Sequence, residues 1–178
     1  MLEVEYRIKP PSKEDIEQMW KEMNYFYKPE EKDSLLSVIE IFKKNYGGKI
    51  LFRSFLVSEN TIFDWYTARN ALDEIDFFEK FLSNKNILHE FEDEDFKGNL
   101  EFGYLNPLTF DGEIASEILF DVTRWWKGSI KELKELTMKF CFELFDDRYD
   151  EIWVYHSKKA WCTWFFDFII DNTYIIID

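Results

Sequence analysis

The chain has 178 residues and a formal net charge of -14 at pH 7, from 36 Asp and Glu against 22 Lys and Arg. Its hydrophobic content of 46%, with 20% Phe, Trp and Tyr, excludes an intrinsically disordered acidic chain. A surface this negative repels nucleic acid and anionic membranes, and it attracts basic proteins.

The first half of the chain alternates predicted strands and helices. Residues 2–8 alternate apolar and charged side chains, which is the period of a half-buried strand. A capping-box pattern opens a predicted helix over 12–23, and a second helix is predicted over 33–46. Residues 49–57 predict a strand that is apolar on both faces and therefore central in its sheet. Apolar residues at helical spacing predict a third helix over 68–83.

The second half of the chain also contains predicted strands and helices. A strand is predicted over 100–104, followed by helices over 111–126 and 129–144, the latter opened by a second capping-box pattern. The β-rich end of the chain begins with a strand over 152–156.

The last twenty residues predict a hairpin. Two β-rich runs, 161–170 and 173–177, are separated by Asp171-Asn172, a good turn sequence. Together these elements predict an α+β fold, a single compact domain over residues 1–178 with a mixed or mostly antiparallel sheet packed with about five helices.

The two cysteines and the apolar segments indicate the compartment. Cys141 and Cys162 lie in apolar contexts and are expected to be free, buried thiols in a reducing environment. The N-terminus has no signal-peptide pattern, and the longest apolar run, 160–170, is interrupted by Asp167 and too short to span a bilayer. We therefore expect a soluble, cytoplasmic protein.

The sharpest local charge feature is an acidic run near the middle of the chain. It consists of Glu90, Glu92, Asp93, Glu94 and Asp95. One interpretation is a loop whose carboxylates take the place of phosphates in the basic cleft of a partner. The alternative is a solvated loop that only aids solubility. The spacing excludes an EF-hand calcium loop.

A dense aromatic segment near the C-terminus offers a second candidate contact. If residues 161–170 form a strand, one face holds Trp161 and Phe165 beside Asp167, so that face is expected to be partly exposed. Because Trp is enriched at interaction hot spots, Trp161 is predicted to contact a partner.

No catalytic or cofactor signature is found. His89 and His156 lack the context of a catalytic triad, the two His and two Cys do not have zinc-site spacing, and no glycine-rich phosphate loop is present. We therefore predict no catalytic residue, no metal and no cofactor, and no direct contact with nucleic acid.

The function hypothesis consequently rests on electrostatics. In overall character the chain resembles bacterial toxin-immunity proteins as a class, although no motif identifies a family. The leading hypothesis is an immunity protein or antitoxin that binds and neutralises a basic, nuclease-like toxin. The alternatives are a small enzyme that uses Asp64, Asp111 or Asp167 with a metal, and a structural or sensor module of a phage or mobile element. The sequence does not indicate an oligomeric state.

Overall fold

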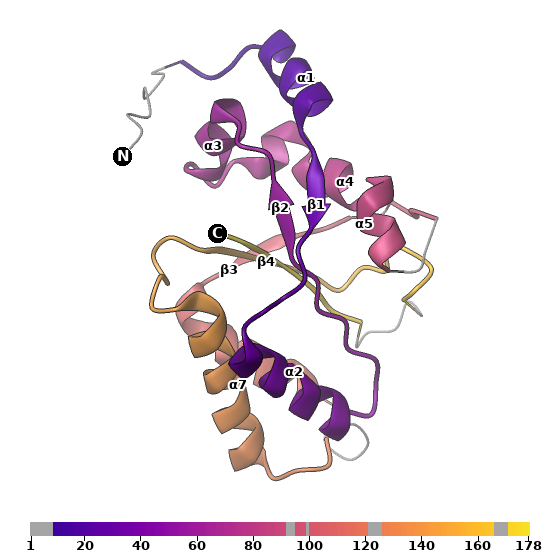
Figure 1. Cartoon of the computed structure of the whole chain (residues 1–178), viewed down its shortest axis with the longest axis vertical. Helices are drawn as coiled ribbons and strands as arrows, with labels where there is room; N and C mark the ends of the chain where they lie inside the picture. The colour runs from indigo at the N-terminus through magenta and orange to yellow at the C-terminus, as the bar shows by residue number, and fades with distance from the viewer. Residues whose placement is uncertain (1–8, 92–94, 99, 121–125, 166–170) are drawn as a thin grey trace. The chain divides into compact units, whose positions relative to one another are not determined.

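A computed structural model describes residues 9–91, 95–98, 100–120, 126–165 and 171–178 (Figure 1). The predicted α+β class is confirmed, because the described residues form seven α-helices and two small antiparallel sheets. They divide into two compact units. Unit 1 comprises Met1–Lys28, Ser54–Leu100 and Trp161–Trp164, and unit 2 comprises Pro29–Arg53, Glu101–Ala160 and Phe165–Asp178. Neither unit is one continuous stretch of sequence, and the single domain over 1–178 stays a prediction.

Unit 1 begins with a helix and a two-stranded sheet. Helix α1 (Lys13–Glu22) starts at the predicted capping box, in which Ser12 and Asp15 each accept a hydrogen bond from the other's backbone N–H. Strand β1 (Tyr25–Tyr27) pairs antiparallel with β2 (Phe55–Val57). The predicted strand over 49–57 is therefore much shorter than expected. It is also not covered on both faces, because the side chain of Leu56 is 54% exposed.

The remaining elements of unit 1 are short helices. They are α3 (Thr61–Thr67), the 3-10 helix η1 (Leu72–Ile75), α4 (Phe77–Leu82) and α5 (Lys85–Glu90). The expected continuous helix over 68–83 is wrong. Asn70 and Asp76 adopt left-handed backbone conformations with φ of 52° and 55°, and these interrupt the helical hydrogen bonding between α3, η1 and α4.

Aromatic contacts join these short elements. Phe81 of α4 contacts Tyr25 of β1 and Phe55 of β2, with ring centroids 5.2 and 5.9 Å apart. Within α4, Phe77 stacks on Phe81 at 5.4 Å, and Phe77 also meets Phe63 of α3 at 5.4 Å. One face of the two-stranded sheet thus packs on α4.

Unit 2 contains a three-stranded antiparallel sheet. Its strands are β3 (Gly103–Leu105), β4 (Trp153–Ser157) and β5 (Thr173–Ile177), in the order β3-β4-β5. The C-terminal strand is thus confirmed, but it pairs with β4. Of its expected hairpin partner, residues 161–165 form no strand, and 166–170 lie outside the described residues.

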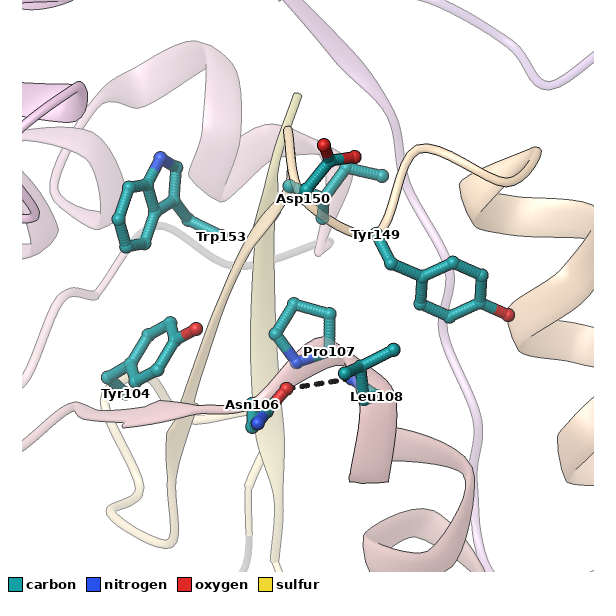
Figure 2. Close-up of a pocket in the computed structure, with 8 residues that line it drawn as sticks. Tyr104, Asn106, Pro107, Leu108, Tyr149, Asp150 and Trp153 are labelled. Atoms are coloured by element: carbon teal, nitrogen blue, oxygen red, sulfur yellow. Dashed lines mark hydrogen bonds between the residues drawn. The ribbon is translucent and has the colours of Figure 1, made fainter.

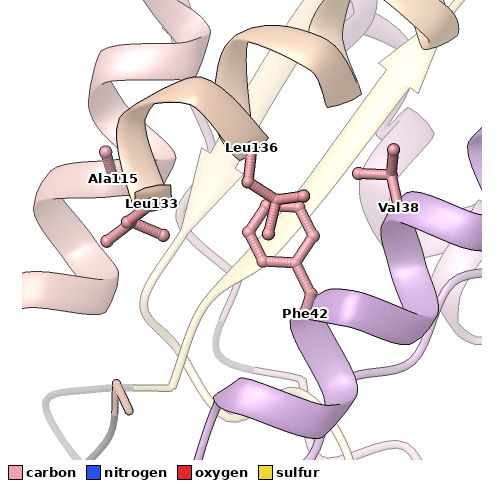
Figure 3. Packing of buried hydrophobic residues seen from close by; sticks show 5 residues of the cluster. All are labelled: Val38, Phe42, Ala115, Leu133 and Leu136. Atoms are coloured by element: carbon pink, nitrogen blue, oxygen red, sulfur yellow. The ribbon is translucent and has the colours of Figure 1, made fainter. Parts of the chain in front are cut away.

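Three helices provide the main core of unit 2. Helix α2 (Asp33–Asn45) and helix α7 (Ile130–Phe145) match their predictions closely, and α7 opens at the predicted Ser129 capping box. Helix α6 (Phe110–Leu119) follows the 3-10 helix η2 (Pro107–Thr109). Figure 3 shows how α2, α6 and α7 meet through a buried cluster made of Val38, Phe42, Ala115, Leu133 and Leu136. No helix among the described residues has the length and apolar character needed to cross a membrane.

Polar contacts set the pairing of α2 with α7. The Lys32 ammonium donates to the backbone carbonyl of Glu143 at 2.7 Å, and the Ser34 hydroxyl donates to the Glu143 carboxylate at 2.6 Å. The Ser34 hydrogen bond, assisted by Lys32, lowers the pKa of Glu143. At the other end of α2, the Lys127 N–H donates to the carbonyl of Asn45 at 3.1 Å. The start of α2 is thus tied to the end of α7, and its last residue is tied to the segment that precedes α7.

Both cysteines are free and buried, as the sequence predicts. Cys141 lies on the buried face of α7 among Phe110, Phe145 and Ile152. Burial, with a smaller contribution from the Asp111 carboxylate, raises the pKa of the Cys141 thiol to about 12. The thiolate form that reacts with electrophiles is therefore scarce in the folded chain.

The buried cluster in unit 2 predicts a large difference between two substitutions on the same helix. Leu133→Ala removes a side chain with no exposed surface and should reduce the free energy of unfolding by roughly 2–5 kcal/mol. Ile130→Ala, at a side chain that is 60% exposed, should change it by less than about 1 kcal/mol. Urea unfolding followed by circular dichroism measures both, and equal losses would contradict the packing described here.

The cysteine environments predict slow thiol chemistry. At pH 8 a thiol-reactive dye should label the native chain far more slowly than it labels glutathione, because reaction requires the chain to open. The denatured chain should label rapidly at both cysteines. Rapid labelling of either cysteine in the native chain would refute this prediction.

Candidate protein-binding surface

The acidic run predicted from the sequence lies where α5 ends. Glu90 is the last residue of α5, and Asp95 is exposed to solvent. Glu92, Asp93 and Glu94 lie outside the described residues. The structure thus places the two ends of the run in unit 1 and leaves the contacts of its centre as a prediction.

Both ends of this segment are held by the same short stretch of chain. On the N-terminal side, the Phe91 ring packs edge-on against Trp161, with centroids 4.9 Å apart. On the C-terminal side, Phe96 forms a bridge with Cys162, and the Lys97 N–H donates to the carbonyl of Trp161 at 2.8 Å. The residues on either side of the centre of the acidic run therefore both contact residues 161–162.

The expectation that Trp161 is exposed is wrong. The side chain of Trp161 has no exposed surface. Residues 163–164 form a turn, so the alternation of a strand, which would put Trp161 on an open face, is absent here. Trp161 cannot contact a partner in this conformation. Its contact with Phe91 makes it a residue that positions the acidic run.

Unit 1 carries a second group of carboxylates on α3, η1 and α4 and in the segments that flank them. All of its members are exposed, and the group consists of Glu59, Asp64, Asp73, Glu74, Asp76 and Glu79. Among the described residues, no Lys or Arg forms an ion pair with any of the six. The term acidic surface is used below for these six residues.

The acidic surface follows from the amphipathic character of the short helices. Their apolar side chains point inward and are buried, namely Phe63, Tyr66, Leu72, Ile75, Phe77 and Phe78. The polar positions between them are left facing solvent, and they are predominantly acidic. Residues 54–100 carry eleven Asp and Glu against four Lys and Arg.

Carboxylates in unit 2 differ from those of the acidic surface in their ion pairing. Several of them pair with a basic side chain within the unit, for example Glu117 with Lys158 at 2.7 Å and Glu101 with Lys159 at 3.4 Å. Asp111 pairs with Lys134 in the same way. The negative charge is thus partly neutralised in unit 2, whereas the acidic surface of unit 1 keeps its charge.

Two groups in unit 1 have pKa values raised by burial and, to a smaller extent, by neighbouring carboxylates. Partial burial, and then the neighbouring Glu59 carboxylate, raise the pKa of Asp64. Burial, together with Glu74, also raises the pKa of the Tyr66 hydroxyl. In both cases a nearby carboxylate disfavours a further negative charge, as expected where like charges are not compensated.

Of the carboxylates proposed for the enzyme alternative, the structure describes two, and these lie in different units. Asp64 lies on α3 of unit 1, Asp111 is paired with Lys134 in unit 2, and Asp167 lies outside the described residues. Within the described part of the chain, no group of three or more His, Cys, Asp or Glu residues could hold a metal ion.

The His156 ring is held by local contacts. His156 on β4 stacks on Tyr174 of β5 with ring centroids 4.7 Å apart, and its Nε2 lies 2.6 Å from Oδ1 of Asn172. The neighbouring Ser157 is buried, and its hydroxyl accepts the Lys159 N–H at 3.1 Å. His89 is exposed near the end of α5. These contacts do not form a serine–histidine–carboxylate arrangement.

Local sequence patterns do not identify the acidic surface, because Asp73, Glu74 and Asp76 taken alone have the spacing of an ordinary charged helix face. The signal that could have extended the cluster is the shortage of Lys and Arg over residues 54–100, since an acidic face without nearby cations has no internal partner.

The raised pKa of Asp64, caused by burial and then by Glu59, predicts that Asp64→Asn stabilises the protein near neutral pH. The raised pKa means that ionised Asp64 is less favourable in the folded than in the unfolded chain. This penalty is fully present above the folded-state pKa, and it disappears as the pH falls below the unfolded-state pKa. The gain in melting temperature should therefore be clear at pH 7 and should vanish in acid.

Glu79→Gln is the matched control, because it also removes one carboxylate of the acidic surface and lies on a different helix. Thermal melts of both variants and the parent chain between pH 3 and pH 8 measure how each change in melting temperature depends on pH. A gain for Asp64→Asn that is independent of pH would contradict the electrostatic explanation.

Comparison with known proteins adds no functional information. No protein-family model, curated protein or solved structure matches the chain. The function is therefore argued from the acidic surface and from the anchored acidic run.

Proposed function

We propose that the chain is a protein-binding inhibitor of a basic partner, an immunity protein or antitoxin that neutralises a nuclease-like toxin in the cytoplasm. The observation that carries this proposal is the acidic surface of unit 1, whose six exposed carboxylates have no Lys or Arg ion-pair partner among the described residues. The net charge of -14 gives the same sign to the long-range field.

The repulsion between the carboxylates of the acidic surface supports the proposal. Like charges held close together repel and lower the stability of the folded state. At Asp64, burial is the larger cause of the raised pKa, and repulsion from the Glu59 carboxylate adds to it. A basic partner removes the repulsion when it binds. The surface is therefore better suited to a complex than to the isolated chain.

A nuclease is the partner class that fits this chemistry best. Enzymes that cleave nucleic acid hold the phosphate backbone with Lys and Arg side chains. A row of carboxylates offers such side chains the same charge as a row of phosphates, with charge-assisted hydrogen bonds of similar geometry. An inhibitor of this type needs no catalytic residue and no cofactor of its own.

Exposed apolar side chains in unit 1 supply the short-range contacts that a stable complex also needs. Phe26 of β1 and Leu56 of β2 are opposite each other in the register and are 59% and 54% exposed. They lie on the face of the sheet opposite the one that packs on α4. An aromatic and aliphatic pair of this kind can contribute to the slow dissociation of a complex.

The proposal predicts association that depends on salt and on the acidic surface. After the partner has been identified by crosslinking and co-purification from the native host, stopped-flow kinetics should show that association slows as salt is raised, because ions screen charges beyond about 8–10 Å. A variant carrying Asp73→Asn, Glu74→Gln, Asp76→Asn and Glu79→Gln should associate about tenfold more slowly at low salt.

A control with the same loss of charge separates the surface from the net charge. It carries Glu31→Gln, Asp146→Asn, Asp147→Asn and Glu151→Gln, four exposed positions in unit 2. This control should slow association by less than about threefold, since its changes lie outside the acidic surface. A third variant that neutralises Glu92, Asp93, Glu94 and Asp95 tests the acidic run separately.

Three results would overturn the proposal. The first is a partner that is itself acidic. The second is association whose rate does not change with salt. The third is an equal effect of the surface variant and the unit 2 control, which would show that net charge acts without a defined surface.

A further inference from the structure

Unit 2 contains a pocket of about 270 Å³ at one end of its three-stranded sheet (Figure 2). The rings of Tyr104 and Trp153 lie on one side of it, Pro107 and Leu108 lie below, and Asp150 lies above in this view. The pocket is small, open to solvent and mostly apolar, with one carboxylate at its edge.

Two turns at the same end of the sheet build this pocket. Strand β3 ends at Leu105, and Asn106 then caps the short helix η2, its side-chain oxygen accepting the Leu108 N–H at 3.0 Å. On the neighbouring strand, the chain leaves α7 through Asp146 and Asp147, both with positive φ, and enters β4 at Trp153. Because β3 and β4 are antiparallel, the end of one lies beside the start of the other.

The aromatic side of the pocket is held by cross-strand packing. Tyr104 is opposite Tyr155 in the register, so Trp153 is its diagonal neighbour on the same face of the sheet. The Tyr104 and Trp153 rings meet edge-on with centroids 5.7 Å apart. Tyr104 remains 47% exposed, which leaves part of its ring available to a ligand.

The carboxylate at the edge of the pocket belongs to Asp150. Asp150 is exposed and makes no ion pair or side-chain hydrogen bond with another described residue. The nearest cation in sequence, Arg148, is held by Asp178 through two guanidinium–carboxylate hydrogen bonds. The pocket therefore combines aromatic rings with an uncompensated negative charge.

We propose that this pocket binds the guanidinium group of an arginine side chain presented by a partner protein. Aromatic rings attract a cation through their electron-rich faces, and a planar guanidinium can stack on a ring while it donates two hydrogen bonds to a carboxylate. A lysine ammonium group supplies the positive charge, but it is not planar and cannot stack on a ring in the same way. That the arginine comes from a partner protein rests on the proposed function, because a basic partner presents such side chains. That the pocket binds a guanidinium group does not depend on the proposed function.

Titration with small probes tests the pocket without the partner. N-acetyl-arginine amide should shift the indole N–H resonance of Trp153 in the ¹⁵N-labelled protein, this resonance being assigned by its absence from the Trp153→Phe variant. N-acetyl-citrulline amide, which has the same shape and no charge, should bind at least about tenfold more weakly, and N-acetyl-lysine amide should fall between them.

Two variants in the same turn make the test specific. Asp150→Asn should weaken binding of the arginine probe about fivefold, whereas Asp147→Asn, an exposed residue that does not line the pocket, should leave it unchanged. Citrulline binding as tightly as arginine, or an unchanged affinity in Asp150→Asn, would overturn the assignment. Either result would leave the proposal for the acidic surface standing. Conversely, association that does not depend on salt, together with intact arginine binding, would overturn only the proposed function.

Discussion

Tertiary packing of aromatic side chains is the interaction on which the rest of unit 1 depends. Its helices α3, α4 and α5 have seven, six and six residues, and its strands have three each. Helices this short are not stable in isolation, because the cost of nucleation is not repaid by so few hydrogen bonds. The contacts of Phe81 with Tyr25 and Phe55 therefore stabilise elements that local propensity alone would not. The acidic surface exists only while these helices are held in place.

The two units distribute charge in different ways. Unit 2 neutralises many of its carboxylates internally, and the Lys32 and Ser34 contacts to Glu143 show that such pairs also order its helices. Unit 1 leaves its carboxylates facing solvent over a core of Phe and Tyr side chains. A surface of this kind produces a long-range negative field, and the repulsion between its charges does not add to stability.

The acidic surface and the pocket of unit 2 would recognise the same type of side chain by different physical means. The surface acts over several ångströms through its summed charge, and salt weakens it. The pocket acts only at contact, through the Tyr104 and Trp153 rings and the Asp150 carboxylate, and it discriminates a planar guanidinium from a compact ammonium. Steering and selection can thus be separated by experiment in this chain.

Local patterns in the sequence determined the α+β class, the capping boxes at Ser12 and Ser129, helices α2 and α7, the C-terminal strand and the two free cysteines. Each of these depends on neighbouring residues or on composition. The tertiary structure alone decided that Trp161 is buried against Phe91, that β5 pairs with β4, and that left-handed residues divide 68–83. It also decided which described carboxylates pair with a cation, because ion pairing and burial depend on which distant segments meet, and no local pattern contains that information.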